Sequence, residues 1–355
     1  MLRIKDLFIK LQGFCLKNIN LDIYEGDFFS ILGPTGSGKS LLLEAIIGHL
    51  PDNAICSSGR IFWKKKELTS LPPHKRGMGI VYQDLGLFPH MTVENNIRFG
   101  LRYHTLEGAD TERRFNMLVD TLGLGGILHR YPERISGGER QRVALARVLI
   151  LSPRVVLLDE PLSSLDPPSQ DEAKRLLKRL HSELGVTFVL VSHNFEEVMY
   201  LSERGAVMHK GMVVQKGLIR HIFNRPSSSF VANFVGARNV FAVTYDSGKI
   251  MMGRLSIETE NHSACCKIPN RISIRPEKII ALDCQDNRTA SENRFSGRVC
   301  NIWKRNFHLH VEIEAEGVMF HALWPEHVSD LIHLEKGAKV HFGFSKKDVN
   351  AFREQ

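Results

Sequence analysis

The sequence predicts two domains of different class, an α/β domain followed by a smaller all-β domain. In the first two thirds of the 355-residue chain, short apolar runs alternate with stretches of helical periodicity. Past the stretch NRPSSS at 224–229, short alternating segments are separated by turn residues, which indicates a small β-barrel or sandwich. We place the boundary near residue 232, so the expected domains are 1–232 and 233–355.

Three apolar runs are the predicted parallel strands of the first domain. The run 28–32 leads into a glycine-rich loop and then into a helical stretch at 41–49. The runs 155–158 and 187–191 are short, rich in β-branched residues and flanked by helical patterns, as buried parallel strands are. The segment 139–150 repeats apolar residues at helical spacing. Strands and helices are therefore expected to alternate through this domain.

The composition limits where the protein works. Hydrophobic residues make up 43% of the chain and charged residues 24%, values typical of a globular protein with a buried core. We find no run of about 18 apolar residues, which predicts that no transmembrane helix is present. The first residues alternate like a strand and lack the basic-then-apolar layout of a signal peptide. We expect a cytoplasmic protein that reaches a membrane only through a partner.

The charge and the cysteines exclude two further classes. The formal net charge is +8, but the basic residues are spread along the chain rather than gathered in one block. We therefore expect no nucleic-acid partner. The six cysteines have no C-x-x-C pair and no regular spacing, so we expect ordinary thiols in a reducing compartment.

The strongest motif lies between the first predicted strand and the helix that follows it. The segment fits G-x-x-x-x-G-K-[ST] and consists of Gly33, Pro34, Thr35, Gly36, Ser37, Gly38, Lys39 and Ser40. Its glycines let backbone amides turn inward around phosphate groups, and the helix N-terminus adds a favourable partial charge. Lys39 is expected to reach the β and γ phosphates, and the Ser40 hydroxyl to bind Mg²⁺. The motif thus predicts a P-loop that binds ATP with Mg²⁺.

Two carboxylates follow the second predicted strand, at Asp159 and Glu160. An apolar strand ending in a carboxylate is a common way to hold a Mg²⁺ ligand near a P-loop, so we assign Asp159 to the metal. Glu160 is expected to polarise the water that attacks the γ-phosphate, as a general base. Taken alone, the pair is equally consistent with two solvated acids, but the P-loop favours the catalytic interpretation.

A second helix start with anion-binding character occurs in the segment ISGGER at 135–140. Ser136, Gly137 and Gly138 offer a hydroxyl and backbone amides at the start of the helical stretch. The alternative is a plain glycine turn that caps a helix. A second phosphate-binding helix start in one chain has an obvious use if it serves a nucleotide held by another copy.

The sequence resembles the ABC (ATP-binding cassette) ATPases, because the segment ISGGER is similar to their LSGGQ-type signature. The resemblance covers about the first 230 residues and brings further matches in the expected order. Gln83 in VYQDLGLFPH resembles the Q-loop glutamine, Asp166 in SSLD the D-loop aspartate, and His193 in LVSHN the switch histidine. It implies an α/β P-loop NTPase (ABC ATPase) domain with a helical subdomain, followed by a small all-β OB-like (TOBE) domain.

The resemblance also implies roles for these residues. Glu160, His193, Lys39 and Gln83 are the expected catalytic residues, and Ser40, Gln83 and Asp159 the expected metal-site residues. Since the chain has one P-loop and one signature, a homodimer with two ATP molecules held head to tail is expected. The family usually stacks an aromatic residue on adenine upstream of the P-loop, and Phe14 is the nearest candidate here.

The C-terminal third resembles the TOBE domains of importer ATPases at 270–280, 295–303 and 342–352. This implies integral membrane permease subunits, indirectly a substrate-binding protein, and a peripheral position at the cytoplasmic face of the membrane. The segments 40–44 and 235–241 look most like molybdate/tungstate importers. Sulfate, ferric iron and polyamine remain alternative cargoes, and a soluble ABC ATPase without a transport role is a further alternative.

The same resemblance raises the question of an oxyanion site in the C-terminal domain, as some relatives have. Here Ala290, Glu292, Trp324, His327 and Ser345 replace the residues expected at such a site. Because a carboxylate disfavours a bound anion, we expect this domain to act as a structural or dimer-contact module.

The histidines between 308 and 341 could suggest a metal site, and His308 and His310 would share one strand face. Strand histidines without carboxylate or cysteine partners are usually ordinary surface groups. We therefore expect no metal to be bound there.

Overall fold

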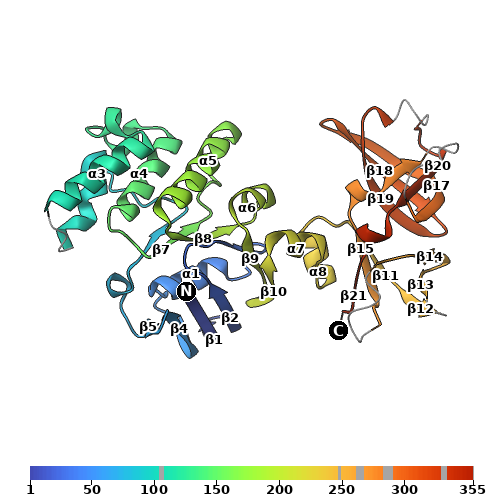
Figure 1. Ribbon diagram of the computed structural model, residues 1–355, viewed down its shortest axis with the longest axis horizontal. Coiled ribbons are helices and arrows are strands. Elements are labelled where there is room, and N and C mark those ends of the chain that lie inside the picture. The colour runs from blue at the N-terminus through green and yellow to red at the C-terminus, as the bar shows by residue number, and fades with distance from the viewer. Residues whose placement is uncertain (104–107, 247–248, 261–267, 283–290, 329–333, 355) are drawn as a thin grey trace. The chain divides into compact units, whose positions relative to one another are not determined.

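The computed structural model describes residues 1–103, 108–246, 249–260, 268–282, 291–328 and 334–354. The chain divides into two compact units, residues 1–220 and 221–355 (Figure 1). This division falls earlier than the boundary near residue 232 expected from the sequence. Helix α8 (Ser229–Phe234) accounts for the difference, because it contacts strands β11 and β15 of the second unit. In addition, Asn350 Nδ2 donates to the carbonyl oxygen of Pro226 at 2.9 Å.

A six-stranded sheet forms the centre of the first unit, in the order β10–β9–β3–β8–β7–β6. Strands β9, β3, β8, β7 and β6 run parallel, while β10 pairs antiparallel with β9. The strands are β3 (Phe28–Leu32), β6 (Met78–Val81), β7 (Val155–Asp159), β8 (Thr187–Ser192), β9 (Arg204–His209) and β10 (Met212–Leu218). The three predicted apolar runs are β3, β7 and β8. Every residue of β3 and β8 is buried, which explains why these strands have no polar face.

A second, antiparallel sheet shares its core with the first. Its order is β2–β1–β4–β5, with β1 (Leu2–Leu11), β2 (Phe14–Ile23), β4 (Ile55–Trp63) and β5 (Lys66–Glu67). One cluster of buried side chains contains residues of both sheets and of helix α1 (Lys39–Ile47), among them Ile9, Leu42 and Val189. The helix that begins at the P-loop lysine is therefore anchored in the core shared by the two sheets.

Helices complete the first unit, and Figure 1 shows α3 and α4 side by side. Its α-helices are α2 (Val93–Arg98), α3 (Gly108–Leu122), α4 (Gly137–Leu149), α5 (Pro167–Leu184) and α6 (Phe195–Leu201), while α7 (Ile219–Asn224) contains the boundary between residues 220 and 221. Short 3₁₀ turns occur at Pro73–Lys75, Phe99–Tyr103, Gly125–Ile127 and Pro132–Arg134. The stretches predicted to be helical at 41–49 and 139–150 are α1 and α4, each starting two residues earlier than expected. No helix in the described parts of the chain is long and apolar enough to cross a membrane.

The second unit consists mainly of antiparallel strands in three sheets, β11–β15–β21, β12–β13–β14 and β16–β20–β17–β18–β19. The strands are β11 (Asn239–Ala242), β12 (Thr244–Asp246), β13 (Lys249–Met252), β14 (Leu255–Ile257), β15 (Arg271–Ile274), β16 (Ile280–Leu282), β17 (Asn293–Arg305), β18 (His308–Ala315), β19 (Val318–Pro325), β20 (Lys339–Phe344) and β21 (Asn350–Phe352). Two 3₁₀ turns lie at Pro276–Lys278 and Lys346–Asp348. The core contains Phe320, Phe342 and Phe344, all fully buried. The predicted all-β class of this domain is confirmed.

Candidate active site

The loop between β3 and α1 has a shape that its glycines make possible. Gly36 and Gly38 have φ values of 77° and 99°, in the left-handed region that side chains avoid. A Cβ atom at Gly33 would lie 2.4 Å from the carbonyl oxygen of Met208, and one at Gly38 would lie 2.6 Å from Leu16 Cδ2. The loop can therefore pass this close to its neighbours only without side chains at these positions.

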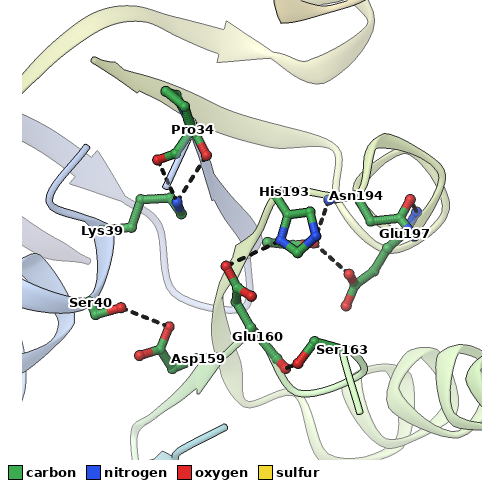
Figure 2. A network of polar contacts seen from close by, with 11 residues as sticks. Pro34, Lys39, Ser40, Asp159, Glu160, Ser163, His193, Asn194 and Glu197 are labelled. Carbon is green, nitrogen blue, oxygen red and sulfur yellow. Dashed lines mark hydrogen bonds and ion pairs between the residues drawn. The ribbon is translucent and has the colours of Figure 1, made fainter. Parts of the chain in front are cut away.

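Lys39, the first residue of α1, folds back under this loop. Its Nζ donates to the carbonyl oxygens of Gly33 at 2.9 Å and Pro34 at 3.0 Å (Figure 2). The side chain is 94% buried, and burial lowers the pKa of its ammonium group, while the charges of Glu160 and Asp159 raise it. A buried cation in a loop of open glycines is suited to an anionic ligand.

Ser40 and Asp159 meet at the carboxyl end of β7. Ser40 Oγ donates to Asp159 Oδ1 at 3.2 Å (Figure 2). Burial and the nearby Glu160 raise the pKa of Asp159, whereas the hydrogen bond from Ser40 and the charge of Lys39 lower it. A hydroxyl and a carboxylate oxygen are the hard ligands that Mg²⁺ takes beside a nucleotide, so these two residues fit the ion. Gln83 lines the same groove as Asp159, next to this pair.

Glu160 and His193 form the next pair along the sheet edge. His193 Nδ1 lies 3.2 Å from Glu160 Oε1 (Figure 2). Glu160 follows β7 and His193 follows β8, so both side chains emerge where neighbouring parallel strands end, which is where open α/β sheets bind ligands. The Glu160 backbone N–H donates to Val191 O at 3.0 Å, and its carbonyl accepts from Ser163 Oγ at 2.8 Å. The backbone of Glu160 is therefore fixed by hydrogen bonds to β8 and to the loop that follows β7.

Glu197 belongs to the same network, although nothing in the sequence analysis pointed to it. It is 5% exposed, and its carboxyl accepts a hydrogen bond from Ser192. A signal was present in its position, because Glu197 lies one turn before Leu201 on the buried face of α6. An acidic residue on the apolar face of a helix indicates a buried polar contact, and this helix starts two residues after His193.

The residues of the ISGGER segment lie at the start of α4, apart from this network. Ser136 caps the helix: its Oγ accepts from the Glu139 N–H at 3.2 Å, and Glu139 Oε2 accepts from the Ser136 N–H at 2.7 Å. A Cβ at Gly137 would lie 3.5 Å from Leu165, so this segment abuts the loop that leads to Asp166. Asp166 caps α5 through the Ser169 N–H at 3.4 Å. Within one chain, these residues thus have roles as helix caps.

Phe14 packs against the P-loop and against the core between the two sheets. A Cβ at Gly38 would lie 2.9 Å from Phe14 Cζ, and the ring is only partly buried. Its expected stacking on adenine stays a prediction.

In the C-terminal domain, the residues that replace those expected at an oxyanion site lie in different surroundings. Trp324 is 2% exposed, and its indole N–H donates to Ile279 O at 2.8 Å, so it is a core residue. Glu292 Oε2 accepts from Ser345 Oγ and from the Lys346 N–H, both at 3.1 Å. His327 is exposed, and position 290 lies outside the described residues.

The histidines of this domain were expected to be ordinary surface groups. His310 stacks on Trp303 with ring centroids 5.2 Å apart. In the parts of the chain that the structure describes, no group of three or more His, Cys, Asp or Glu side chains could hold a metal ion.

Three features meet at one edge of the parallel sheet. They are a glycine-rich loop with a buried lysine, a hydroxyl–carboxylate pair, and a glutamate beside a histidine. This arrangement defines a P-loop nucleoside triphosphatase. The comparison with known protein families gives the same class. The family model for ABC transporters matches residues 16–163.

Three similar proteins are import ATP-binding proteins. The molybdate/tungstate import ATP-binding protein WtpC of Pyrococcus horikoshii is 35% identical, over 99% of this chain and 100% of that protein. The spermidine/putrescine import ATP-binding protein PotA of Trichodesmium erythraeum is 36% identical, over 84% and 80%. The Fe(3+) ions import ATP-binding protein FbpC of Fusobacterium nucleatum is 34% identical, over 96% and 89%.

A solved structure resembles the first unit. The dimeric structure of the ATP-binding cassette MJ0796, in a post-hydrolysis state bound to ADP and Pi, has a TM-score of 0.54 and 29% identity, over 62% of this chain and 99% of that one. The chain therefore belongs to the ATP-binding subunits of ABC importers, and it is an ATPase coupled to solute import. The family and the fold class expected from the sequence are confirmed.

Proposed function

We propose that this protein is the ATP-hydrolysing subunit of a molybdate/tungstate importer. The observation that carries the proposal is the match to the molybdate/tungstate import protein, which extends through the C-terminal domain and covers the whole of that relative. The polyamine and ferric-iron relatives have nearly the same identity, but their matches cover less of this chain and less of the relative. Polyamine or ferric iron is therefore the second candidate cargo.

In the proposed reaction, each side chain has a separate task. Lys39 binds the β and γ phosphates with its ammonium group, and the amides of residues 33–38 surround them. Ser40 and Asp159 hold Mg²⁺, with Gln83 beside them, and the ion would neutralise charge on the phosphate oxygens. Glu160 accepts a proton from the attacking water, and His193 contacts the γ-phosphate. These proposed roles agree with the polar contacts described above.

The functional unit is proposed to be a homodimer. Ser136, Gly137 and Gly138 lie at a helix start that, within one chain, is apart from the P-loop network. In a head-to-tail dimer they would close on the nucleotide held by the partner, with Asp166 at the contact between the copies. The dimeric state of the similar ATP-binding cassette supports this assembly.

A groove beside Gln83 is the proposed docking site of the permease. It has a volume of about 1020 Å³ and is lined by Gln83, Phe88, Phe99 and Arg147, among others. Arg147 on α4 donates to Gly86 O at 2.7 Å and Leu85 O at 2.9 Å, so the signature helix is tied to the loop after Gln83. A permease segment bound here would place the protein at the cytoplasmic face of the membrane.

The C-terminal domain is proposed to be a structural or dimer-contact module without an oxyanion ligand. Glu292 is hydrogen bonded to Ser345 and Lys346, so a carboxylate already takes up these anion-binding donors. An added anion would meet the Glu292 charge. Isothermal titration of the full chain with molybdate tests this proposal. Micromolar binding of molybdate that is lost when the hydroxyl donor of Ser345 is removed would contradict it.

The cargo is tested by uptake at limiting supply. Cells with and without the gene are compared for molybdenum, tungsten, sulfate, iron and a polyamine, and a Lys39→Ala variant serves as the inactive control. Loss of molybdenum or tungsten uptake alone supports the proposal. Loss of polyamine or iron uptake would assign the second cargo, and unchanged uptake of every solute would favour an ABC ATPase without this transport role.

A further inference from the structure

A buried carboxyl group is attached to the strand end that carries His193. Glu197 on α6 is 5% exposed, and its Oε2 accepts a hydrogen bond from Ser192 Oγ at 2.5 Å (Figure 2). Ser192 is itself buried, is the last residue of β8, and directly precedes His193. Any movement of this carboxyl therefore reaches the backbone next to the histidine.

The Ser192 hydroxyl joins the two sides of His193. While it donates to Glu197, it also accepts a hydrogen bond from the backbone N–H of Asn194 at 3.0 Å. Asn194 in turn caps α6, because its Oδ1 accepts from the N–H groups of Glu196 at 2.9 Å and Glu197 at 3.3 Å. The residues before and after His193 thus belong to one network, and Glu197 is its buried end.

The other carboxyl oxygen of Glu197 differs from the one that accepts from Ser192. Among the described residues, Oε1 is buried and makes no hydrogen bond. Glu197, Glu160 and His193 line one cavity of about 140 Å³, which has room for several water molecules. Since a buried polar atom left unpaired is unfavourable for folding, stability alone gives no reason for a carboxyl group here.

The surroundings of Glu197 raise the pKa of its carboxyl group. Burial raises the pKa of its carboxyl to about 7, against the lowering effects of the Ser192 hydrogen bond and the charges of His193 and Lys174. The nearby Glu160 raises it slightly further. Glu197 is therefore partly protonated near neutral pH, and in both forms it offers an acceptor oxygen to Ser192.

We propose that Glu197 is a positioning residue for ATP hydrolysis, which holds His193 beside Glu160 through Ser192 and Asn194. The contact that it maintains is the 3.2 Å approach of His193 Nδ1 to Glu160 Oε1. The inference rests on the proposed roles of Glu160 and His193. A displacement of a reacting group by about 1 Å can lower a rate by up to about a hundredfold, so loss of this network acts on the chemical step.

The test is steady-state ATP hydrolysis by the purified full chain. Glu197→Ala and Ser192→Ala should each lower kcat by about tenfold or more. The KM for ATP should stay within about twofold, because nucleotide binding depends on the P-loop. Glu197→Gln keeps an acceptor oxygen for Ser192, and its kcat should stay within about threefold of the wild type. Glu196→Ala is the matched control, since Glu196 is exposed on the same helix and donates to Asn194 through its backbone N–H, which the substitution keeps.

A double variant tests whether the two side chains act through one contact. Glu197→Ala combined with Ser192→Ala should be no slower than the slower single variant, because both remove the same hydrogen bond. Additive losses, an equally poor Glu197→Gln, or a loss confined to KM would each overturn the positioning role. Should Glu197→Ala fail to fold, the comparison of Ser192→Ala with Glu197→Gln decides the question.

Glu160→Gln, measured alongside, separates this inference from the proposed function. Wild-type hydrolysis in Glu160→Gln would remove the proposed base, whatever Glu197 does. An inactive Glu160→Gln together with wild-type kcat in Glu197→Ala and Ser192→Ala would leave the base in place and remove only the positioning role.

Discussion

At the scale of single residues, Glu160 combines an unusual backbone conformation with a constrained side chain. Its φ of 45° lies in the left-handed region, which costs free energy for a residue other than glycine. The hydrogen bond from its N–H to Val191 O maintains this conformation. In this conformation, the Glu160 carboxylate points from the end of β7 towards His193. Strain of this kind, held at a strand end, supports a catalytic role for Glu160.

Replacing Glu160 by Gln should abolish turnover while ATP binding persists. The amide keeps the shape of the side chain but is a much weaker base, so kcat should fall by about 10² to 10⁴. ATP hydrolysis and binding of a fluorescent ATP analogue are measured on the same preparation, and size-exclusion chromatography with ATP should show a stable dimer. Glu196→Gln is the control, and undiminished hydrolysis in Glu160→Gln would contradict the base role.

Glu197 should make the stability of the first unit depend on pH. Its pKa is about 7 in the folded protein and 4.5 ordinarily, so the folded state binds the proton more tightly than the unfolded chain. Stability therefore falls as the pH rises from about 4.5 to about 7, by about 3 kcal/mol in total. Glu197→Gln removes this titration. Its Tm should gain on the wild type between pH 5 and pH 8, whereas parallel curves would contradict the shift.

At the scale of elements, helix α1 depends on a residue far along the chain. Arg76 is 5% exposed, and its Nη1 donates to Ala45 O at 2.8 Å and Ile46 O at 2.9 Å, in the last turn of α1. The same guanidinium donates to Leu71 O and Thr69 O, both at 2.8 Å. A buried arginine thus satisfies carbonyl groups that a helix end leaves unpaired.

Arg76→Met should destabilise the helix that begins with Lys39. The loss of several charged hydrogen bonds, with carbonyls left buried, should cost about 2–4 kcal/mol. At this domain size, that corresponds to a Tm lower by at least about 4 °C. Thermal unfolding followed by fluorescence measures the change. Arg60→Met is the control because Arg60 is exposed on β4, and equal shifts in both variants would contradict the capping role.

At the scale of the whole molecule, the candidate site is divided between two regions. The P-loop, Asp159, Glu160 and His193 gather at the edge of the central sheet, whereas Ser136 lies at the start of α4. One chain therefore holds both halves of the proposed nucleotide site without bringing them together. A head-to-tail dimer would join each P-loop to the signature of its partner, which gives two equivalent sites.

Mixing two inactive variants should restore hydrolysis if the dimer is assembled in this way. Lys39→Ala removes the P-loop function, and Ser136→Arg blocks the signature. A heterodimer of the two holds one intact site, so a random equimolar mixture should recover about a quarter of the wild-type sites. The ATPase rate of the mixture is compared with those of the separate variants. A mixture no faster than its components would contradict a shared site.

The fold class and most of the candidate site at the edge of the sheet could be predicted from the sequence. Residues 28–40 and 155–160 carry this information locally, because a strand, its turn and its polar end are contiguous in the chain. The same holds for His193, which directly follows the apolar strand at 187–192. Each of these side chains reaches the site through its own strand, and parallel strands end at one edge.

The distant residues that support that edge could be identified only from the packing of the folded chain. The hydrogen bond from Ser192 to Glu197, the capping of α1 by Arg76, and the tie from Arg147 to the loop after Gln83 depend on how elements pack. The attachment of α8 to the second unit likewise depends on its contacts with β11 and β15. Apart from the place of Glu197 on the apolar face of α6, these contacts have no local pattern, because a buried polar side chain is specified by its partners and not by its neighbours in sequence.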